Sequence, residues 1–242
     1  HYLMDRGFKV RIGSGVGLRS GYFAGSDQIR QMDLEEMFAD EEVKALFCTR
    51  GGYGSARLLE TMQWDIVRQN PKILIGFSDI TALSMGILSA TGLVTFAGPM
   101  VAAELAQPVS TTVENALWET LMTPRSRCDL PIGKAVKTIR AGRAEGILIG
   151  GNLSVLCSLI GSRYLPDFSG AILFIEDVGE SVYRIDRMLL QLKYAGILNS
   201  VAGVVLGTFT AIPKQVADRE LDEVLEEYLL PLNVPLMSGI PF

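Results

Sequence analysis

Ser78 stands where a strand-like stretch gives way to a helix-like one, a position that suits a nucleophile. The segment PKILIGFSDITALSMGIL, residues 71–88, begins with an apolar, β-rich run and continues with an apolar helical run. Ligands of open α/β sheets collect at the carboxyl ends of the strands, beside helix N-termini. The main-chain N–H of Asp79 would lie in the first helical turn and could donate to an oxyanion. The alternative is that Ser78 only caps the helix.

A glycine-rich turn in TRGGYGSARLL, residues 49–59, is the second candidate. Adjacent glycines let the backbone approach a ligand closely and adopt positive φ angles. Gly51 and Gly52 could therefore supply an oxyanion donor or cradle a phosphate. The turn lacks the G-K-[ST] of a P-loop. The alternative is a tight turn without a ligand.

Carboxylates gather in ILFIEDVGESVYRIDRMLLQL, residues 172–192. Glu176 follows four apolar residues, so it should lie partly buried at the end of a strand, where a carboxylate needs a partner. Orienting a histidine, binding an amino group and holding a metal are the open roles. No histidine or cysteine cluster accompanies Glu176, which disfavours the metal. Glu180 is suited to a helix N-terminus, where an acid is favourable.

Two further residues bear on these candidates. In EGILIGGNLSVL, residues 145–156, Asn152 should cap a helix, although the turn could also border a binding cleft. A serine nucleophile normally needs a base, and His1 is the only histidine. His1 is expected to be a surface residue.

Composition narrows the class of protein. The 242 residues are 48% hydrophobic and 20% charged, which is typical of a globular protein with a sizeable core. The net charge of −5, without a basic block, disfavours nucleic acid as a partner. No run approaches the ~18 apolar residues of a membrane span. The three cysteines, one of them Cys128, lack metal-ligand spacing, and we expect neither a metal nor a cofactor.

The first part of the chain alternates predicted strands and helices. Continuous apolar strands separated by helices indicate a parallel sheet covered on both faces. Ser26 or Asp27 should cap the first helix. The predicted strands are residues 8–13, 43–49, 72–77 and 92–98, and the predicted helices are residues 28–38, 55–62, 79–90 and 111–122.

Proline, glycine and basic residues then gather, which predicts a linker over residues 123–144 between domains of residues 1–122 and 145–242. In the second domain, apolar spacing predicts a long helix with Val182, Ile185, Leu189 and Leu192 on one face. The other predicted elements are strands 146–151, 171–178 and 201–209, and helices 152–161 and 215–228. Neither end has the polar composition usual for a terminus, so we expect an internal segment that lacks a first strand and a C-terminal part.

Five blocks of this sequence resemble, in the same order, the LD-carboxypeptidase family of serine peptidases. This family comprises the muramoyltetrapeptide carboxypeptidases and the microcin C immunity peptidases. The blocks are ALFCTRGGYGSARLL, PKILIGFSDITAL, EGILIGGNLSVL, LFIEDVGESVYRIDRMLLQL and VAGVVLGTF, which together span nearly the whole chain. The resemblance implies an α/β fold: a flavodoxin-like parallel-sheet domain followed by a smaller α/β domain of the swivelling β/β/α type.

The resemblance also implies a Ser–Glu–His triad. Ser78 matches its nucleophile and Glu176 its glutamate, and the main-chain N–H groups of Gly52 and Asp79 match its oxyanion hole. The histidine should follow Phe242, so residues 1–242 alone should hydrolyse nothing appreciable. The residues expected to contribute to substrate binding are Arg50, Gly51, Tyr53 and Asn152.

The activity implied is a serine carboxypeptidase that releases terminal D-alanine from murein tetrapeptides in cell-wall recycling. The resemblance further implies a cytoplasmic homodimer whose partner is a small peptide substrate, with no cofactor, nucleic acid or membrane. An immunity-type peptidase that hydrolyses a microcin C-like aminoacyl nucleotide is the alternative within the family. A non-catalytic ligand-binding protein is the second alternative. A glutamine-amidotransferase-like domain would need a cysteine where Ser78 stands.

Overall fold

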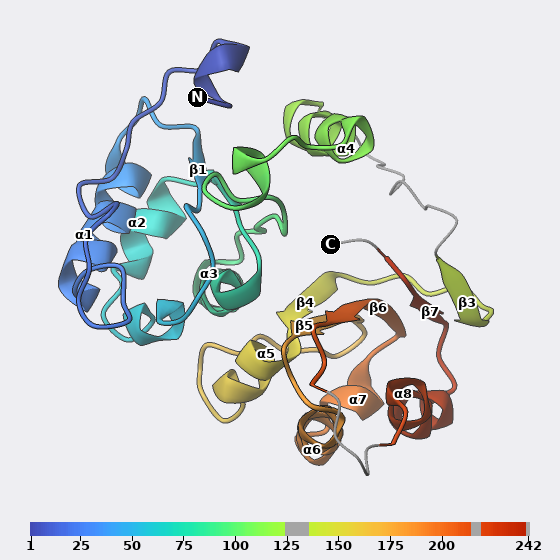
Figure 1. Ribbon diagram of the computed structural model, residues 1–242. Coiled ribbons are helices and arrows are strands. Elements are labelled where there is room, and N and C mark those ends of the chain that lie inside the picture. Colours follow the sequence, from blue (N-terminus) through green and yellow to red (C-terminus); the bar gives the residue numbers. More distant parts are fainter. Residues whose placement is uncertain (124–135, 214–218, 241–242) are drawn as a thin grey trace. The chain divides into compact units, whose positions relative to one another are not determined.

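The computed structural model describes residues 1–123, 136–213 and 219–240 (Figure 1). The chain divides into two compact units, His1–Pro131 and Ile132–Phe242. Each unit combines helices with parallel strands, which confirms the predicted α/β class. None of the helices in the described ranges has the length and apolar character needed to cross a membrane.

The first unit is built on a two-stranded parallel sheet of β1 (Ala45–Phe47) and β2 (Ile73–Ile75). Phe96 extends this sheet through a single parallel bridge to Ile75. Helices α1 and α2 lie side by side, as do α2 and α3 (Figure 1). The helices and 3-10 turns are η1 (Met4–Arg6), α1 (Asp27–Ala39), η2 (Ser55–Leu58), α2 (Trp64–Gln69), η3 (Ser78–Ile80), α3 (Thr81–Thr91), η4 (Glu104–Ala106) and α4 (Thr111–Met122).

Local signals account for the ends of these helices. The Ser26 side chain accepts a hydrogen bond from Ile29 N at 3.3 Å, so Ser26 is the cap of α1. Helix α3 ends at Gly92, which adopts the left-handed conformation that glycine permits. Burial stabilises the unit, at about 1.5–3 kcal/mol for each fully buried leucine or isoleucine. The fully buried core side chains of the unit include Phe38, Leu59, Leu74, Ile75 and Ile87.

Three predictions for this unit were wrong. Residues 8–13 form no strand, because Val10 and Ile12 are exposed and no described strand pairs with the segment. Residues 92–98 contribute only the bridge at Phe96. Residues 55–62 form the short 3-10 turn η2, not an α-helix.

The second unit is built on a five-stranded sheet in the order β3-β7-β6-β5-β4. Strands β4, β5, β6 and β7 pair with one another in parallel, and β3 pairs with β7 in antiparallel orientation. Their bounds are β3 (Lys137–Arg140), β4 (Leu148–Asn152), β5 (Ile172–Val178), β6 (Gly203–Thr210) and β7 (Leu236–Ser238). Strand β3 falls within residues 123–144, and residues 124–135 lie outside the described part.

Helix α6 contacts α5, α7 and α8 (Figure 1). The apolar stripe predicted for α6 is buried as expected, from Val182 to Leu192. Helix α8 begins at Leu221, later than the predicted start at residue 215, and residues 214–218 are outside the described ranges. The helices and turn of the unit are α5 (Leu153–Leu159), α6 (Val182–Tyr194), α7 (Ile197–Ser200), α8 (Leu221–Leu229) and η5 (Leu230–Leu232).

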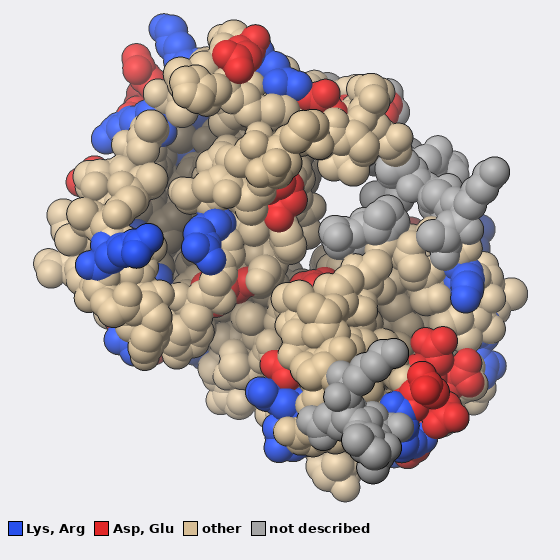
Figure 2. Space-filling view, in the orientation of Figure 1, with Lys and Arg blue, Asp and Glu red and all other residues tan. Residues whose placement is uncertain are grey.

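The charged face of α8 is solvated. Figure 2 shows Asp and Glu side chains gathered over this helix, where Arg219 lies within ion-pair distance of Asp186, Glu223 and Glu227. Exposed pairs of this kind contribute little to stability. On the face shown in Figure 2, Lys and Arg side chains are scattered.

Candidate functional site

The backbone at Ser78 turns sharply from strand to helix. Strand β2 ends at Ile75, Phe77 is extended, and Ser78 begins η3 with a φ of 61°. A residue with a Cβ costs on the order of 1–3 kcal/mol in such a conformation, and this strain is typical of functional sites. The capping alternative for Ser78 was wrong, because the cap positions of η3 and α3 are Phe77 and Ile80.

The Ser78 hydroxyl is half-buried and lies against the glycine-rich turn. Among the described residues, no hydrogen-bond partner of Ser78 Oγ is found. A Cβ placed on Gly51 would lie 3.1 Å from Ser78 Cβ and 3.2 Å from Ser78 Oγ. Glycine at residue 51 therefore leaves room beside the hydroxyl, and the first unit brings the two predicted segments together.

Two main-chain N–H groups, one in the residue after Gly51 and one in the residue after Ser78, have no acceptor among the described residues. They belong to Gly52, whose φ is 132°, and to Asp79, in the first turn of η3. Free N–H groups beside a nucleophile can stabilise a developing oxyanion. Ser78, Gly52 and Asp79 therefore all lie in the first unit, and their roles as nucleophile and oxyanion donors stay predictions.

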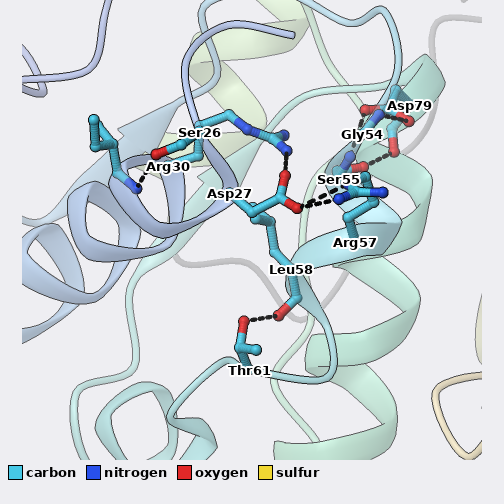
Figure 3. Close-up of polar contacts among 10 residues, drawn as sticks. Ser26, Asp27, Arg30, Gly54, Ser55, Arg57, Leu58, Thr61 and Asp79 are labelled. Atoms are coloured by element: carbon cyan, nitrogen blue, oxygen red, sulfur yellow. Dashed lines mark hydrogen bonds and ion pairs between the residues drawn. The ribbon is translucent and has the colours of Figure 1, made fainter. Parts of the chain in front are cut away.

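The Asp79 side chain ties the glycine-rich turn to η3 (Figure 3). Its carboxylate, only 8% exposed, accepts hydrogen bonds from Gly54 N at 3.3 Å and from Ser55 N at 2.9 Å. The Ser55 hydroxyl donates in turn to the main-chain carbonyl of Asp79. Three hydrogen bonds thus join two segments that lie 24 and 25 residues apart.

A second polar group supports the turn from α1 (Figure 3). Asp27 pairs with Arg57, whose Nε donates at 2.8 Å, and with Arg30. The hydrogen bond from Arg57 is the largest of the effects that lower the pKa of Asp27. Both arginines lie over the ring of Phe23. This ring stacks on Tyr53 with a centroid separation of 5.7 Å, so the residue after Gly52 is anchored on one side.

The predicted binding residues of the turn differ in exposure. Tyr53 is 61% exposed although it stacks on Phe23. Arg50 is exposed and forms no ion pair with any described residue of its unit. Its exposed guanidinium stands one residue before Gly51.

In the second unit, Asn152 and Glu176 are register partners at the carboxyl ends of β4 and β5. The Asn152 side chain caps α5 by accepting from Val155 N at 3.2 Å, as predicted. Asp177, which is 3% exposed, accepts from Ser154 N at 2.9 Å and from Asn152 Nδ2 at 3.2 Å. These contacts fix the strand ends on either side of Glu176.

Glu176 itself is half-buried and incompletely paired. Its Oε1 is buried without a hydrogen-bond partner in the described part of the chain. Burial, followed by the charge of Asp177, raises the pKa of Glu176 to about 7, and a hydrogen bond from Asn152 opposes the shift. A Cβ on Gly207 would lie 2.9 Å from Glu176 Cβ, so glycine there makes room for the glutamate. Such a carboxylate is suited to a partner that donates a hydrogen bond.

The remaining candidates take other roles. Glu180 pairs with Arg184 at 2.8 Å and is not the cap of α6, which is Ser181. Burial is the largest cause that raises the pKa of Cys48 and of Cys157 to about 12, so both thiols stay protonated at neutral pH. Cys128 lies outside the described residues. The described ranges contain no group of three or more His, Cys, Asp or Glu side chains placed to hold a metal.

Sequence reasoning missed the buried aspartates. Asp79 was expected to act through its N–H, and Asp177 had no role, yet each carboxylate holds the backbone of a neighbouring segment. The available signal was the pair S-D or E-D at the end of an apolar run, where an acid needs hydrogen-bond donors.

Comparison with known proteins identifies the family. Residues 1–98 match the model of the LD-carboxypeptidase N-terminal domain, and residues 145–242 match that of the C-terminal domain. The probable murein peptide carboxypeptidase of Bacillus subtilis (strain 168) is 38% identical over 240 residues, which cover 98% of this chain and 75% of the relative. The chain belongs to the LD-carboxypeptidase family.

Other LD-carboxypeptidase family members extend the comparison. The crystal structure of muramoyltetrapeptide carboxypeptidase from Oxalobacter formigenes has a TM-score of 0.86 at 32% identity, over 99% of this chain and 81% of that one. The microcin C7 self-immunity protein MccF of Escherichia coli is 30% identical, over 98% of this chain and 77% of the relative. MccF in complex with aspartyl sulfamoyl adenosine has a TM-score of 0.90 at 27% identity, over 99% of this chain and 80% of that one.

Proposed function

We propose that this LD-carboxypeptidase family member is a serine peptidase that releases terminal D-alanine from a murein tetrapeptide. The observation that carries the assignment is the strained turn at Ser78, which presents beside Gly51 a hydroxyl without a hydrogen-bond partner among the described residues. The relatives named as murein peptide and muramoyltetrapeptide carboxypeptidases support the choice of substrate.

The proposed reaction begins when Ser78 Oγ attacks the carbonyl carbon of the L-to-D amide bond and loses its proton to a base. The N–H groups of Gly52 and Asp79 stabilise the oxyanion, and losing one such donor typically costs about 10²–10³ in rate. The base then protonates the amine of the departing D-alanine. Water hydrolyses the acyl-enzyme and regenerates Ser78.

Glu176 would orient the base. A histidine N–H donated to the unpaired Oε1 would satisfy this buried atom and favour the ionised carboxylate. His1, the only histidine of the sequence, is exposed in the first unit and is not proposed as this base. Asn152 would hold Glu176 in place, since the two side chains are hydrogen-bonded at paired strand ends.

Arg50 would bind the free carboxylate of the substrate, because it is exposed and has no ion pair within the described part of its unit. Tyr53 would contact the neighbouring part of the peptide. Following the same resemblance, we propose that the protein acts in cell-wall recycling as a cytoplasmic homodimer.

The test is D-alanine release from murein tetrapeptide by the full-length protein that carries the proposed histidine base and by its Ser78→Ala variant. We expect the variant to lose at least about 10³-fold in kcat, with residual catalysis from the oxyanion donors. Ser84→Ala, which alters a half-buried serine on α3, should keep full activity. Full activity in Ser78→Ala would overturn the assignment.

The immunity-type reaction is the second candidate, because MccF is 30% identical to this chain and has been solved with aspartyl sulfamoyl adenosine. Assaying this compound beside the tetrapeptide separates the two substrates. Binding of either compound without turnover, in wild type and Ser78→Ala alike, would instead indicate a non-catalytic binding protein.

A further inference from the structure

Two aspartates of the first unit hold glycine-containing turns in the same manner. Asp33, on α1, accepts hydrogen bonds from Ser14 N at 2.9 Å, Gly15 N at 2.7 Å and Ser14 Oγ at 2.7 Å. Asp79 accepts from Gly54 N and Ser55 N. Only Asp79 is also adjacent in the chain to Ser78, so its contacts connect a turn to the proposed nucleophile.

The turn held by Asp79 contains several glycines and is therefore intrinsically flexible. Gly52 and Gly54 both have positive φ angles, 132° and 122°, and glycine is the most flexible residue in the unfolded and locally open chain. A Cβ on Gly54 would lie 2.9 Å from the ring of Phe23, so packing against this ring constrains the turn at Gly54. The hydrogen bonds to the Asp79 carboxylate then fix residues 54 and 55 relative to η3.

We propose that the Asp79 side chain is a positioning residue for the oxyanion hole, an inference that rests on the proposed function. By binding Gly54 N and Ser55 N, and by accepting the Ser55 hydroxyl on its own carbonyl, Asp79 fixes the N–H of Gly52 relative to its own N–H and to Ser78. The same residue thus supplies one donor through its main chain and places the other through its side chain.

Loss of this link would act on the transition state. Oxyanion donors work only when they point at the atom that becomes charged, and a displacement of about 1 Å can cost about 10²-fold in rate. Substrate binding in the ground state depends on other groups of the turn, such as Arg50. A lowered kcat with little change in KM is therefore the signature of mispositioned donors.

The experiment compares Asp79→Asn with Asp33→Asn in the full chain, because the two changes remove the same kind of contact. We expect Asp79→Asn to lower kcat for the tetrapeptide about 10–100-fold while KM changes less than about 3-fold. Asp33→Asn should keep kcat within about 2-fold even where the two variants lower Tm equally. Titration with a fluorophosphonate gives the active fraction and corrects for unfolded protein.

Ser55→Ala sharpens the comparison, since it removes only the bond to the Asp79 carbonyl, and its loss of kcat should be smaller than that of Asp79→Asn. The inference is overturned if kcat per active site is unchanged in Asp79→Asn, or falls equally in Asp33→Asn. It is also overturned if KM rises while kcat is kept. Persistent D-alanine release by Ser78→Ala would instead overturn the proposed function, so the two failures are distinguishable.

Discussion

The turns at Ser78-Asp79 and at Glu176-Asp177 follow the same plan in two separate units. In each, a residue with a proposed role in the reaction is followed by a buried aspartate, 8% exposed at Asp79 and 3% at Asp177. Each aspartate accepts main-chain N–H groups from the segment after the neighbouring strand, β1 or β4. The aspartate holds the neighbouring backbone, and among the described residues neither Ser78 Oγ nor Glu176 Oε1 has a hydrogen-bond partner.

The two turns differ in how the reactive group is prepared. Ser78 is placed by backbone strain, with a φ of 61° that carries a neutral hydroxyl out of the strand direction. Glu176 stays within β5 and is prepared by burial and by the charge of Asp177, which raise its pKa to about 7. The backbone conformation places the Ser78 hydroxyl, whereas burial leaves the Glu176 carboxylate in need of a hydrogen-bond donor.

Among the changes that test this comparison, the largest expected effect comes from filling the space beside Ser78. In Gly51→Ala the new methyl group would lie 3.2 Å from Ser78 Oγ, so we expect a loss of about 10²-fold in kcat/KM. Gly98→Ala is the matched control, because its methyl group would approach the Ile75 side chain to 3.1 Å, away from the hydroxyl. It should lower Tm and leave kcat/KM unchanged. Equal losses of activity in both variants would mean that the space beside the Ser78 hydroxyl has no specific role in the reaction.

An intermediate effect is expected on the pH dependence of the free energy of unfolding, and its cause is Glu176. Its pKa rises from 4.5 to about 7 on folding, so the native state holds the proton more tightly than the unfolded state. Stability should therefore fall as the pH rises through this window, by on the order of 1–3 kcal/mol between about pH 5 and about pH 8. Urea unfolding of residues 1–242 should show this decline, and Glu176→Gln should remove it.

Asp177→Asn refines the same measurement. Without the neighbouring charge, the pKa of Glu176 should be less raised, and the decline with pH should be smaller than in the wild type but present. The desolvation account fails if wild type and Glu176→Gln lose stability in parallel as the pH rises.

The smallest effect concerns the strain at Ser78. Glycine adopts positive φ without strain, so Ser78→Gly should be more stable than Ser78→Ala by about 1 kcal/mol. On α3 the order should reverse, with Ser84→Gly less stable than Ser84→Ala by about 1 kcal/mol. Thermal unfolding of the four variants tests both signs. If the glycine and alanine variants had the same order of stability at both sites, the claim that Ser78 is held in a strained backbone conformation would be contradicted.

Sequence patterns predicted the elements whose determinants are local. Helix α4 spans Thr111–Met122, the predicted residues, because Ser110 caps it and its apolar spacing is regular. The stripe of α6 was predicted for the same reason. Residues 8–13 show the limit: Phe8, Val10 and Ile12 alternate as in a strand, but a strand needs a neighbour that the local sequence cannot reveal.

The candidate site shows a similar division. Resemblance of short blocks pointed to Ser78, Gly52 and Glu176, and the structure gives the first two a common setting in one unit. The left-handed φ of Ser78 and the hydrogen bonds of Asp79 and Asp177 could not be predicted. They depend on contacts with residues more than 20 positions away, at 54, 55 and 154.

Covalent labelling at Ser78 tests the central claim most directly. The full chain is treated with a fluorophosphonate, and the modified residue is located by mass spectrometry of its peptides. We predict one adduct at Ser78, absent in Ser78→Ala, formed more slowly in Asp79→Asn and at the wild-type rate in Asp33→Asn. An adduct on another residue, or undiminished labelling of Ser78→Ala, would contradict the assignment of the nucleophile.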